Sequence, residues 1–156
     1  MAPTPERKAR RRKDYPFTLD YRTRWNDNDM YDHMNNSVYN FLFDSAVNAY
    51  LADHCGIHPP TSSQHPLVAH TSTDYLRSIA YPAVADVGLR ISHLGRSSVT
   101  YELAVFERGA EEPCAVCDFV HVFVDRATGR PPKDGMGAEL RKGLESLHAA
   151  STLSKL

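Results

Sequence analysis

The sequence of 156 residues is poor in cysteine, has no long apolar run and carries almost no net charge. Its three cysteines, Cys55, Cys114 and Cys117, are an odd number without the spacing of a disulfide framework. No apolar stretch near the N-terminus could serve as a secretory signal, and none elsewhere approaches the roughly 18 apolar residues of a membrane span. These absences exclude a disulfide-stapled secreted domain, and they predict a soluble protein of a reducing compartment.

The net charge of −1 conceals an uneven distribution. Residues 1–14 hold six basic and two acidic side chains, so this segment carries +4 and the remainder −5. Because the segment is also rich in proline and poor in large apolar residues, we predict a disordered basic arm over residues 1–16. The arm is either a plain solvated tail or an anchor for nucleic acid or an anionic membrane. The acidic remainder lacks a helix-turn-helix or RNA-binding motif, which argues against a nucleic-acid partner.

The C-terminal end matches a targeting signal. Ser154-Lys155-Leu156 is the S-K-L address that the peroxisomal import receptor reads at a C-terminus. The sequence therefore predicts a polar tail over residues 149–156 and, in a eukaryote, delivery to peroxisomes by that receptor. Without this signal the protein is expected in the cytoplasm.

Hydrophobic periodicity predicts a strand, a long helix, four more strands and a short helix. The first strand is expected at 17–25, and the helices at about 36–53 and 137–147. The four further strands are expected at 67–77, 86–93, 97–107 and 114–124. This order favours one α+β domain over residues 17–148, with a curled five-stranded antiparallel sheet around the long helix. The last strand is almost wholly apolar, so we expect it to be covered on both faces or to pair with another subunit.

Chemically active side chains gather between the first strand and the long helix. Asp27, Asp29, Asp32 and His33 directly precede the predicted helix start near Asn36. The free N–H groups and the positive dipole end of a helix polarise a carbonyl, and a nearby carboxylate can attack it or activate water. The segment therefore holds the parts for hydrolysing an acyl ester or thioester. If the loop is extended, Asp27 and Asp29 share a face and the pKa of one carboxyl rises.

No metal site is expected. His54 and His58 are four residues apart, but Gly56 interrupts the helix that would bring them onto one face. Cys114 and Cys117 lie in a predicted strand, where residues three apart face opposite sides, and they have no second pair. We predict that these cysteines fill the core.

The segment from Trp25 to Tyr39 resembles the signature of hot-dog-fold acyl-CoA thioesterases of the 4-hydroxybenzoyl-CoA thioesterase type. That pattern reads approximately W-x-D-x-D-x-x-G-H-x-N-N-x-x-Y. It is matched here by Trp25, Asp27, Asp29, His33, Asn35, Asn36 and Tyr39. Residues 74–82 and 90–102 are similar to the family's Tyr-x-Arg-Pro-x-x-x-Gly-Asp region and its Gly-x-Ser-Ser hairpin, and the likeness covers roughly residues 17–145. Asp32 departs from the pattern, because it places a Cβ where the family has glycine and the backbone comes close to the ligand.

This resemblance implies a hot-dog fold and the hydrolysis of a fatty or aromatic acyl-CoA to the free acid and CoA. It implies that Asp29 is the nucleophile or general base and that the backbone N–H near Asn36 polarises the thioester carbonyl. Asp27, His33 and Asn35 would support them, in catalytic or structural roles. CoA is part of the substrate, so no separate cofactor is expected. Family members form their sites at dimer interfaces, which implies a homodimer or a dimer of dimers.

Two further sets of side chains are candidates for substrate contacts. The CoA phosphates call for basic groups, for which the family-like segments offer Arg77, Arg90 and Arg96. Aromatic side chains of the long helix line an acyl tunnel or fill the core. They are Phe41, Phe43 and Tyr50. The alternative function is a non-catalytic hot-dog protein that binds acyl-CoA or acts as a scaffold, a reading that Asp32 motivates.

Overall fold

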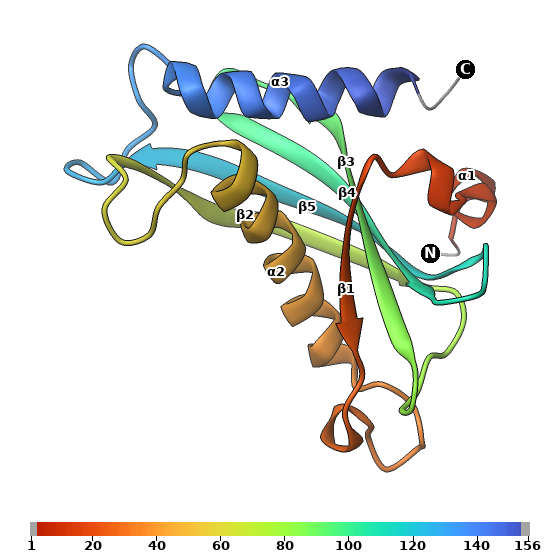
Figure 1. Cartoon of the computed structure of the whole chain (residues 1–156). Coiled ribbons are helices and arrows are strands. Elements are labelled where there is room, and N and C mark those ends of the chain that lie inside the picture. Colours follow the sequence, from red (N-terminus) through yellow and green to blue (C-terminus); the bar gives the residue numbers. More distant parts are fainter. Residues whose placement is uncertain (1–2, 154–156) are drawn as a thin grey trace.

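A five-stranded antiparallel sheet curves around one long helix (Figure 1). The computed structural model describes residues 3–153, and the strand order is β1-β3-β4-β5-β2. The strands and the two long helices are β1 (Phe17–Arg22), α2 (Asn36–His54), β2 (Gln64–Tyr75), β3 (Val84–Leu94), β4 (Ser98–Glu107), β5 (Pro113–Asp125) and α3 (Ala138–Leu153). This arrangement is the α+β hot-dog fold that the sequence predicts, and each expected strand and helix is confirmed. No helix in this part of the chain is long and apolar enough to cross a membrane.

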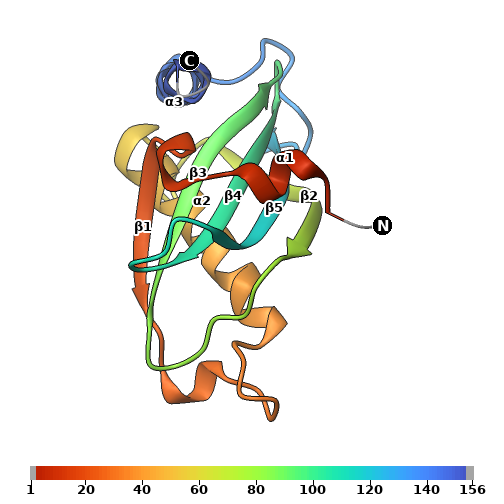
Figure 2. The same cartoon turned by 90° about the vertical axis from the view of Figure 1, so that its right-hand side faces the viewer.

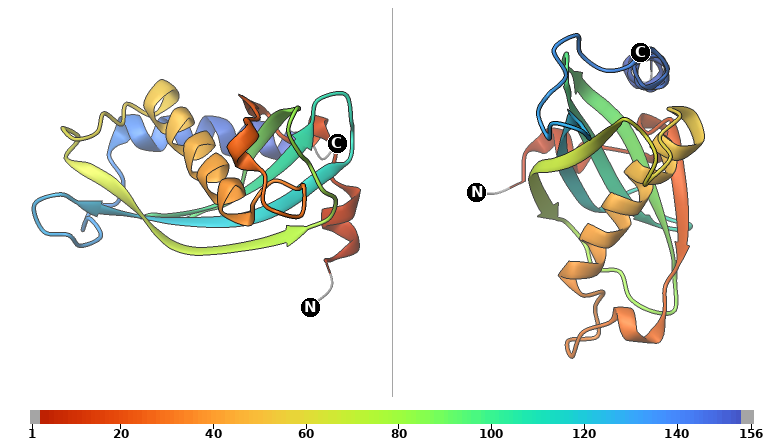
Figure 3. Two further views of the ribbon diagram at one scale, coloured as in Figure 1. Left: turned by 90° about the horizontal axis from the view of Figure 1, so that it is seen from below. Right: turned by 90° about the vertical axis from the view of Figure 1, so that its left-hand side faces the viewer.

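Helix α2 packs on the concave face of the sheet (Figure 3). It begins at Asn36 because the Asn35 side chain caps it, accepting a hydrogen bond from the Ser37 N–H at 2.9 Å. It ends before Gly56, whose φ of +66° suits glycine. One apolar stripe of the helix, including Phe43 and Leu51, is fully buried against inward side chains of the strands. This packing fixes the first turn of α2, from which the candidate site is built.

Strand β2 covers residues 64–75 instead of the predicted 67–77, and two other predicted boundaries are also wrong. Strand β1 stops at Arg22, and residues Trp25–Asp27 form a 3₁₀ turn (η2) instead of continuing the strand. Helix α3 extends to Leu153, so the polar tail expected from residue 149 is helical through that residue. The extension lies along the part of β3 that β1 leaves unpaired, where the Ser151 hydroxyl accepts a hydrogen bond from the Ile91 N–H at 3.0 Å. The predicted peroxisomal address, residues 154–156, lies outside the described residues and stays a prediction.

The disorder predicted for the basic arm is wrong for residues 3–16. They form helix α1 (Pro5–Ala9) and a 3₁₀ turn, η1 (Arg12–Asp14), and they lie across the outer face of the sheet (Figure 2). Three arginines bind carboxylates of four strands. The ion pairs are Arg7 with Asp74 and Asp118, Arg10 with Glu102 at 2.7 Å, and Arg12 with Asp86 at 2.7 Å. Composition detects the basic run but not the carboxylates that pairing of the strands gathers beneath it.

Tyr15 packs the end of the arm against the sheet. Its ring packs edge to face with Phe106, at 5.7 Å between centroids, and its hydroxyl donates a hydrogen bond to Glu102 at 3.1 Å. A Cβ at Gly88 would lie 2.7 Å from the Tyr15 side chain, so glycine is required for this close approach. The arm also covers Val116, which completes the cover on both faces of β5 near residues 113–117. The predicted double cover is thus confirmed for this part of β5, whereas Asp118, Val120 and Val122 farther along the strand are only half-buried.

Candidate active site

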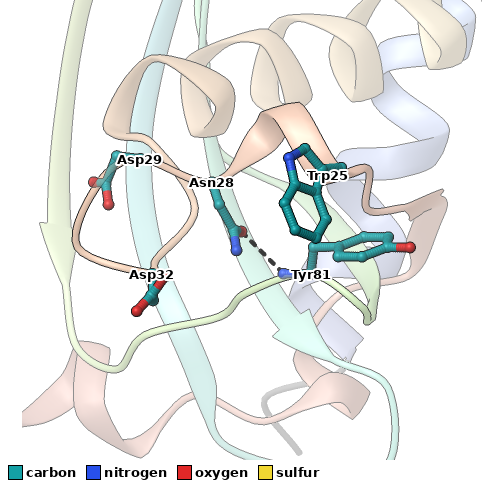
Figure 4. A pocket seen from close by; sticks show the side chains of 5 residues that line it. All are labelled: Trp25, Asn28, Asp29, Asp32 and Tyr81. Atoms are coloured by element: carbon teal, nitrogen blue, oxygen red, sulfur yellow. Dashed lines mark hydrogen bonds between the residues drawn. The ribbon is translucent and has the colours of Figure 1, made fainter.

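The loop between β1 and α2 is folded tightly around Asp29 (Figure 4). The Asp29 Oδ1 atom accepts hydrogen bonds from the backbone N–H groups of Tyr31, at 2.8 Å, and His33, at 3.4 Å. The Asp29 N–H donates to the His33 carbonyl at 2.8 Å. Within the described residues, the other carboxylate oxygen, Oδ2, has no hydrogen-bond partner. One oxygen therefore holds the loop, while the other is available to a reacting group.

A first hollow, of about 400 Å³, lies beside Asp29 and is walled by two aromatic rings. Its lining consists of Trp25, Asn28, Asp29, Asp32 and Tyr81 (Figure 4). The Trp25 and Tyr81 rings meet edge to face with centroids 6.1 Å apart, and the Trp25 side chain is 82% exposed. Asn28 accepts a hydrogen bond from the Tyr81 N–H at 3.0 Å, which ties the loop to the segment before β3. The Asp29 carboxylate points away from the two rings, on the other side of the loop (Figure 4).

Asp32, the departure from the family pattern, occupies a left-handed backbone position. Its φ of +61° explains why glycine is favoured there, and aspartate is one of the few other residues that adopt this conformation readily. The substitution therefore preserves the turn. It also adds a second carboxylate to the lining of the hollow beside Asp29.

Asp27 does not share a face with Asp29. The 3₁₀ turn directs the Asp27 carboxylate inward, where it accepts hydrogen bonds from the Tyr21 hydroxyl at 2.9 Å and the Arg24 N–H at 2.7 Å. Burial, reinforced by this hydrogen bond to Asp27, raises the pKa of Tyr21. Asn35 caps α2 and donates its N–H to the Asp27 carbonyl at 2.8 Å. Both residues hold the loop in place, which is the structural one of the two roles expected for them.

The first turn of α2 offers one free backbone donor. Around it, the N–H groups of Met34, Asn35, Ser37 and Val38 donate to Ile79, Asp27, Asn35 and Asn35 again. The Asn36 N–H has no hydrogen-bond partner among residues 3–153. It points from the positive end of the helix dipole. This is the donor that the resemblance to the thioesterase signature assigns to the thioester carbonyl.

Two more hollows flank this helix start. The second, of about 310 Å³, brings together His33, Asn36 and Arg77, three of the predicted site residues. The third, of about 410 Å³, begins at Ser37 and extends between α2 and β2. Its other lining residues are Asn40, Phe41, Asp44, Val68, Thr71 and Phe119. Asn36 thus lines the second hollow and Ser37 the third, whereas Asp29 and Asp32 line the first.

The other predicted substrate contacts are placed differently. Arg90 is 2% exposed and donates to the Ser151 carbonyl at 2.9 Å, so the prediction that it binds CoA phosphates is wrong. Arg96 lies in the β3–β4 turn, at the end of β3 away from the loop, and the fold of one chain does not bring it to the site. Phe41 lines the third hollow and is 71% exposed, whereas Phe43 and Tyr50 are core residues.

All three cysteines are free and buried, as predicted for Cys114 and Cys117. Burial raises the pKa of Cys114 and Cys117, and it raises that of Cys55 to about 12. Thiols with raised pKa values are poor nucleophiles and poor metal ligands. In the part of the chain that the structure describes, no three histidine, cysteine or acidic side chains are grouped to hold a metal ion.

Some lining residues were not identified from the sequence. Val68, Thr71 and Phe119 belong to strands that were read only as core or sheet, and their common hollow depends on the pairing of β2 with β5. Tyr81 lies in a family-like segment but has no local signal of its own.

Comparison with known proteins assigns the family. The model of the thioesterase-like superfamily matches residues 23–138, and the chain belongs to this superfamily. The crystal structure of the PA5185 protein from Pseudomonas aeruginosa has a TM-score of 0.85 and 42% sequence identity, covering 89% of this chain and 96% of that one. No protein with a curated description matches the sequence.

Two solved structures that are similar to this chain contain CoA. A thioesterase from Thermus thermophilus, complexed with coenzyme A and Zn, has a TM-score of 0.72 and 28% identity over 87% of this chain and 96% of that one. The SAV2348 protein of Staphylococcus aureus, in complex with CoA, has a TM-score of 0.78 and covers 86% of this chain and 84% of that one. At 17% identity, the second shows a shared fold alone.

Proposed function

We propose that this protein is an acyl-CoA thioesterase that hydrolyses a fatty or aromatic acyl-CoA to the free acid and CoA. The observation that carries the proposal is the free Asn36 N–H at the start of α2, in the same short segment as the unpartnered Oδ2 of Asp29. Membership of the thioesterase-like superfamily supports the reaction type. The CoA bound to the Thermus thermophilus thioesterase supports the substrate class.

The reaction uses these two groups in complementary ways. The Asn36 N–H donates a hydrogen bond to the thioester oxygen and stabilises the negative charge that develops on it. Asp29 then either attacks the carbonyl carbon or removes a proton from an attacking water. In the first route CoA leaves from an anhydride that water hydrolyses; in the second, water adds directly and CoA leaves. Both routes consume one water and yield one acid and one thiol.

The second and third hollows provide room for the two parts of the substrate. In this proposal the acyl group extends from the helix start into the third hollow, along Phe41 and Val68. The CoA part lies toward the second hollow, where Arg77 is exposed. Its ion pair with Glu107 is long, at 3.4 Å, so the guanidinium can turn to a phosphate at small cost.

A second copy of the chain completes this arrangement. Strand β2 is an edge strand, and its Leu67 and Val68 side chains are about half exposed beside the exposed Phe41. Apolar side chains on an unpaired strand edge favour pairing with another subunit. We therefore include a homodimer, or a dimer of dimers, in the proposal.

Release of CoA tests the proposed function. A thiol reagent would follow short, medium, long and aromatic acyl-CoAs incubated with wild type and Asp29→Asn in parallel. We expect turnover of at least one class and its collapse in the variant. The alternative, a non-catalytic binder, is favoured by the Asp32 carboxylate in the hollow beside Asp29. Saturable acyl-CoA binding by a folded oligomer without CoA release would establish that alternative.

A further inference from the structure

Two polar side chains are buried without partners on the inner face of the sheet. Tyr101 on β4 is 0% exposed and His121 on β5 is 1% exposed, and their ring centroids are 5.5 Å apart. Among the described residues, neither the Tyr101 hydroxyl nor the His121 Nδ1 atom has a hydrogen-bond partner. Their neighbours on this face are apolar or aromatic core residues.

Core packing alone does not account for these two atoms. Each buried donor or acceptor without a partner destabilises the fold, and phenylalanine at either position would fill a similar space without that cost. Burial lowers the pKa of His121 from 6.5 to about 4, so the imidazole is neutral at physiological pH. A neutral imidazole and a phenol can each donate and accept a hydrogen bond. The pair therefore suits an uncharged polar group rather than an ion.

The pair lies directly behind the wall of the third hollow. Phe119 lines that hollow, and its ring centroid is 5.1 Å from that of His121. Val68, which also lines the hollow, is the cross-strand neighbour of His121. The hollow begins at Ser37, next to the free N–H of Asn36. An acyl group that starts at the helix terminus thus approaches the pair once the Phe119 ring turns aside.

We propose that Tyr101 and His121 determine substrate specificity by binding a hydroxyl or keto group on the distal part of the acyl chain. This inference rests on the proposed function and narrows its substrate class to acyl-CoAs with an uncharged polar group away from the thioester. The thioester stays at the start of α2, and the polar group replaces the partners that the two buried atoms lack.

The test compares two acyl-CoAs of equal medium chain length that differ by one distal hydroxyl. Tyr101→Phe deletes only the unpartnered oxygen. Tyr50→Phe is the matched control, because the Tyr50 hydroxyl is buried but already donates to the Gly143 carbonyl at 2.8 Å. We expect wild type to prefer the hydroxylated substrate at least tenfold in kcat/KM, and Tyr101→Phe to lose most of this preference. Tyr50→Phe should keep the preference while its melting temperature falls.

Binding of the same pair separates the two proposals. Isothermal calorimetry of both acyl-CoAs with the Asp29→Asn protein measures the preference without turnover. If wild type hydrolyses neither compound but the binding preference exists and depends on Tyr101, the proposed function fails and the specificity inference stands. The inference would be overturned if wild type and Tyr101→Phe each showed the same kcat/KM and the same affinity for both compounds. It would also be overturned if wild type preferred the hydroxylated compound and both Tyr101→Phe and His121→Phe kept that preference.

Discussion

Two carboxylates on the outer face of the sheet and two polar rings on its inner face differ in whether the chain supplies their hydrogen-bond partners. On the outer face, the Asp86 and Glu102 side chains are 7% and 9% exposed, and both are paired with arginines of residues 3–16. On the inner face, Tyr101 and His121 are more deeply buried and have no partner in the described chain. The outer groups bind the chain to itself. The inner groups keep unused hydrogen-bonding atoms close to a hollow, so a ligand in that hollow can supply their partners.

The same division recurs within the loop before α2. Asp27 gives both oxygens to internal hydrogen bonds, whereas Asp29, two residues later, uses only Oδ1. Position along the chain is therefore a weak guide to role. A carboxylate whose two oxygens both accept hydrogen bonds from the surrounding chain supports the loop. A carboxylate that keeps one oxygen free can react.

The largest effect is expected when the two aspartates are replaced one at a time by asparagine. Asp29→Asn should lower kcat at least about a hundredfold, the usual scale for an essential general base or nucleophile, while the melting temperature stays close to that of wild type. Asp27→Asn should do the reverse, losing about 1–3 kcal/mol of unfolding free energy because a buried hydrogen-bonded carboxylate is altered. Paired CoA-release and thermal-melt measurements check both. Near-normal turnover of Asp29→Asn would remove Asp29 from the mechanism.

The second prediction concerns the loss of stability at low pH that the buried His121 causes. The pKa of His121 is lowered by burial from 6.5 to about 4, so protons bind the unfolded chain first as the pH falls. Stability from this group is complete above pH 6.5 and is lost between pH 6.5 and 4. At pH 5 this corresponds to a loss of about 2 kcal/mol relative to pH 7. Urea unfolding at the two pH values should show the loss in wild type, and an equal loss in His121→Phe would contradict it.

A third, smaller effect is expected on the outer face. In the described chain, Arg10→Gln leaves the Glu102 carboxylate with the Tyr15 hydroxyl as its hydrogen-bond partner, so the unfolding free energy should fall by about 1–2 kcal/mol. Turnover should be unchanged, because none of the arm residues 3–16 lines the three hollows around α2. Chemical denaturation beside the CoA assay measures both quantities. A stable variant with altered turnover would mean that the outer face takes part in function.

The smallest effect calibrates the others. Glu145→Gln removes an exposed ion pair with Arg141 on α3, in which the Glu145 side chain is 58% exposed. Such pairs contribute less than about 0.5 kcal/mol. The same denaturation experiment should therefore place this variant within that range of wild type. A larger loss would show that exposed ion pairs contribute as much to the unfolding free energy as the partly buried pairs beneath the arm.

Much of the fold could be predicted from the sequence because its periodicity is strong. The stripe of apolar residues on α2, with Asn35 before it and Gly56 after it, defines the helix almost to the residue. The loop from Trp25 to Asn36 could be located because a strand, a cluster of carboxylates and a helix start follow one another directly. Local patterns of this kind survive in the folded chain, since neighbouring residues determine them.

Features that depend on distant partners could not be predicted. The basic arm reads as disordered until the strands bring Asp74, Glu102 and Asp118 onto one face. Arg90 reads as a surface residue until α3 covers it. The inward turn of Asp27 depends on the Tyr21 hydroxyl, and the third hollow depends on the pairing of β2 with β5. In each case the deciding contact joins segments that are distant in the sequence, and the residues near either segment do not reveal its partner.

A crystal structure with a non-hydrolysable ketone analogue of an acyl-CoA, in which a methylene replaces the thioester sulfur, tests the central claim most directly. The claim is that the start of α2 and Asp29 form the reaction centre. The account predicts the ketone oxygen at about 2.7–3.1 Å from the Asn36 nitrogen, the range for a donor that stabilises an oxyanion, with Asp29 Oδ2 facing the carbonyl carbon. A ketone bound away from this helix terminus, with the Asn36 N–H still free, would contradict the account.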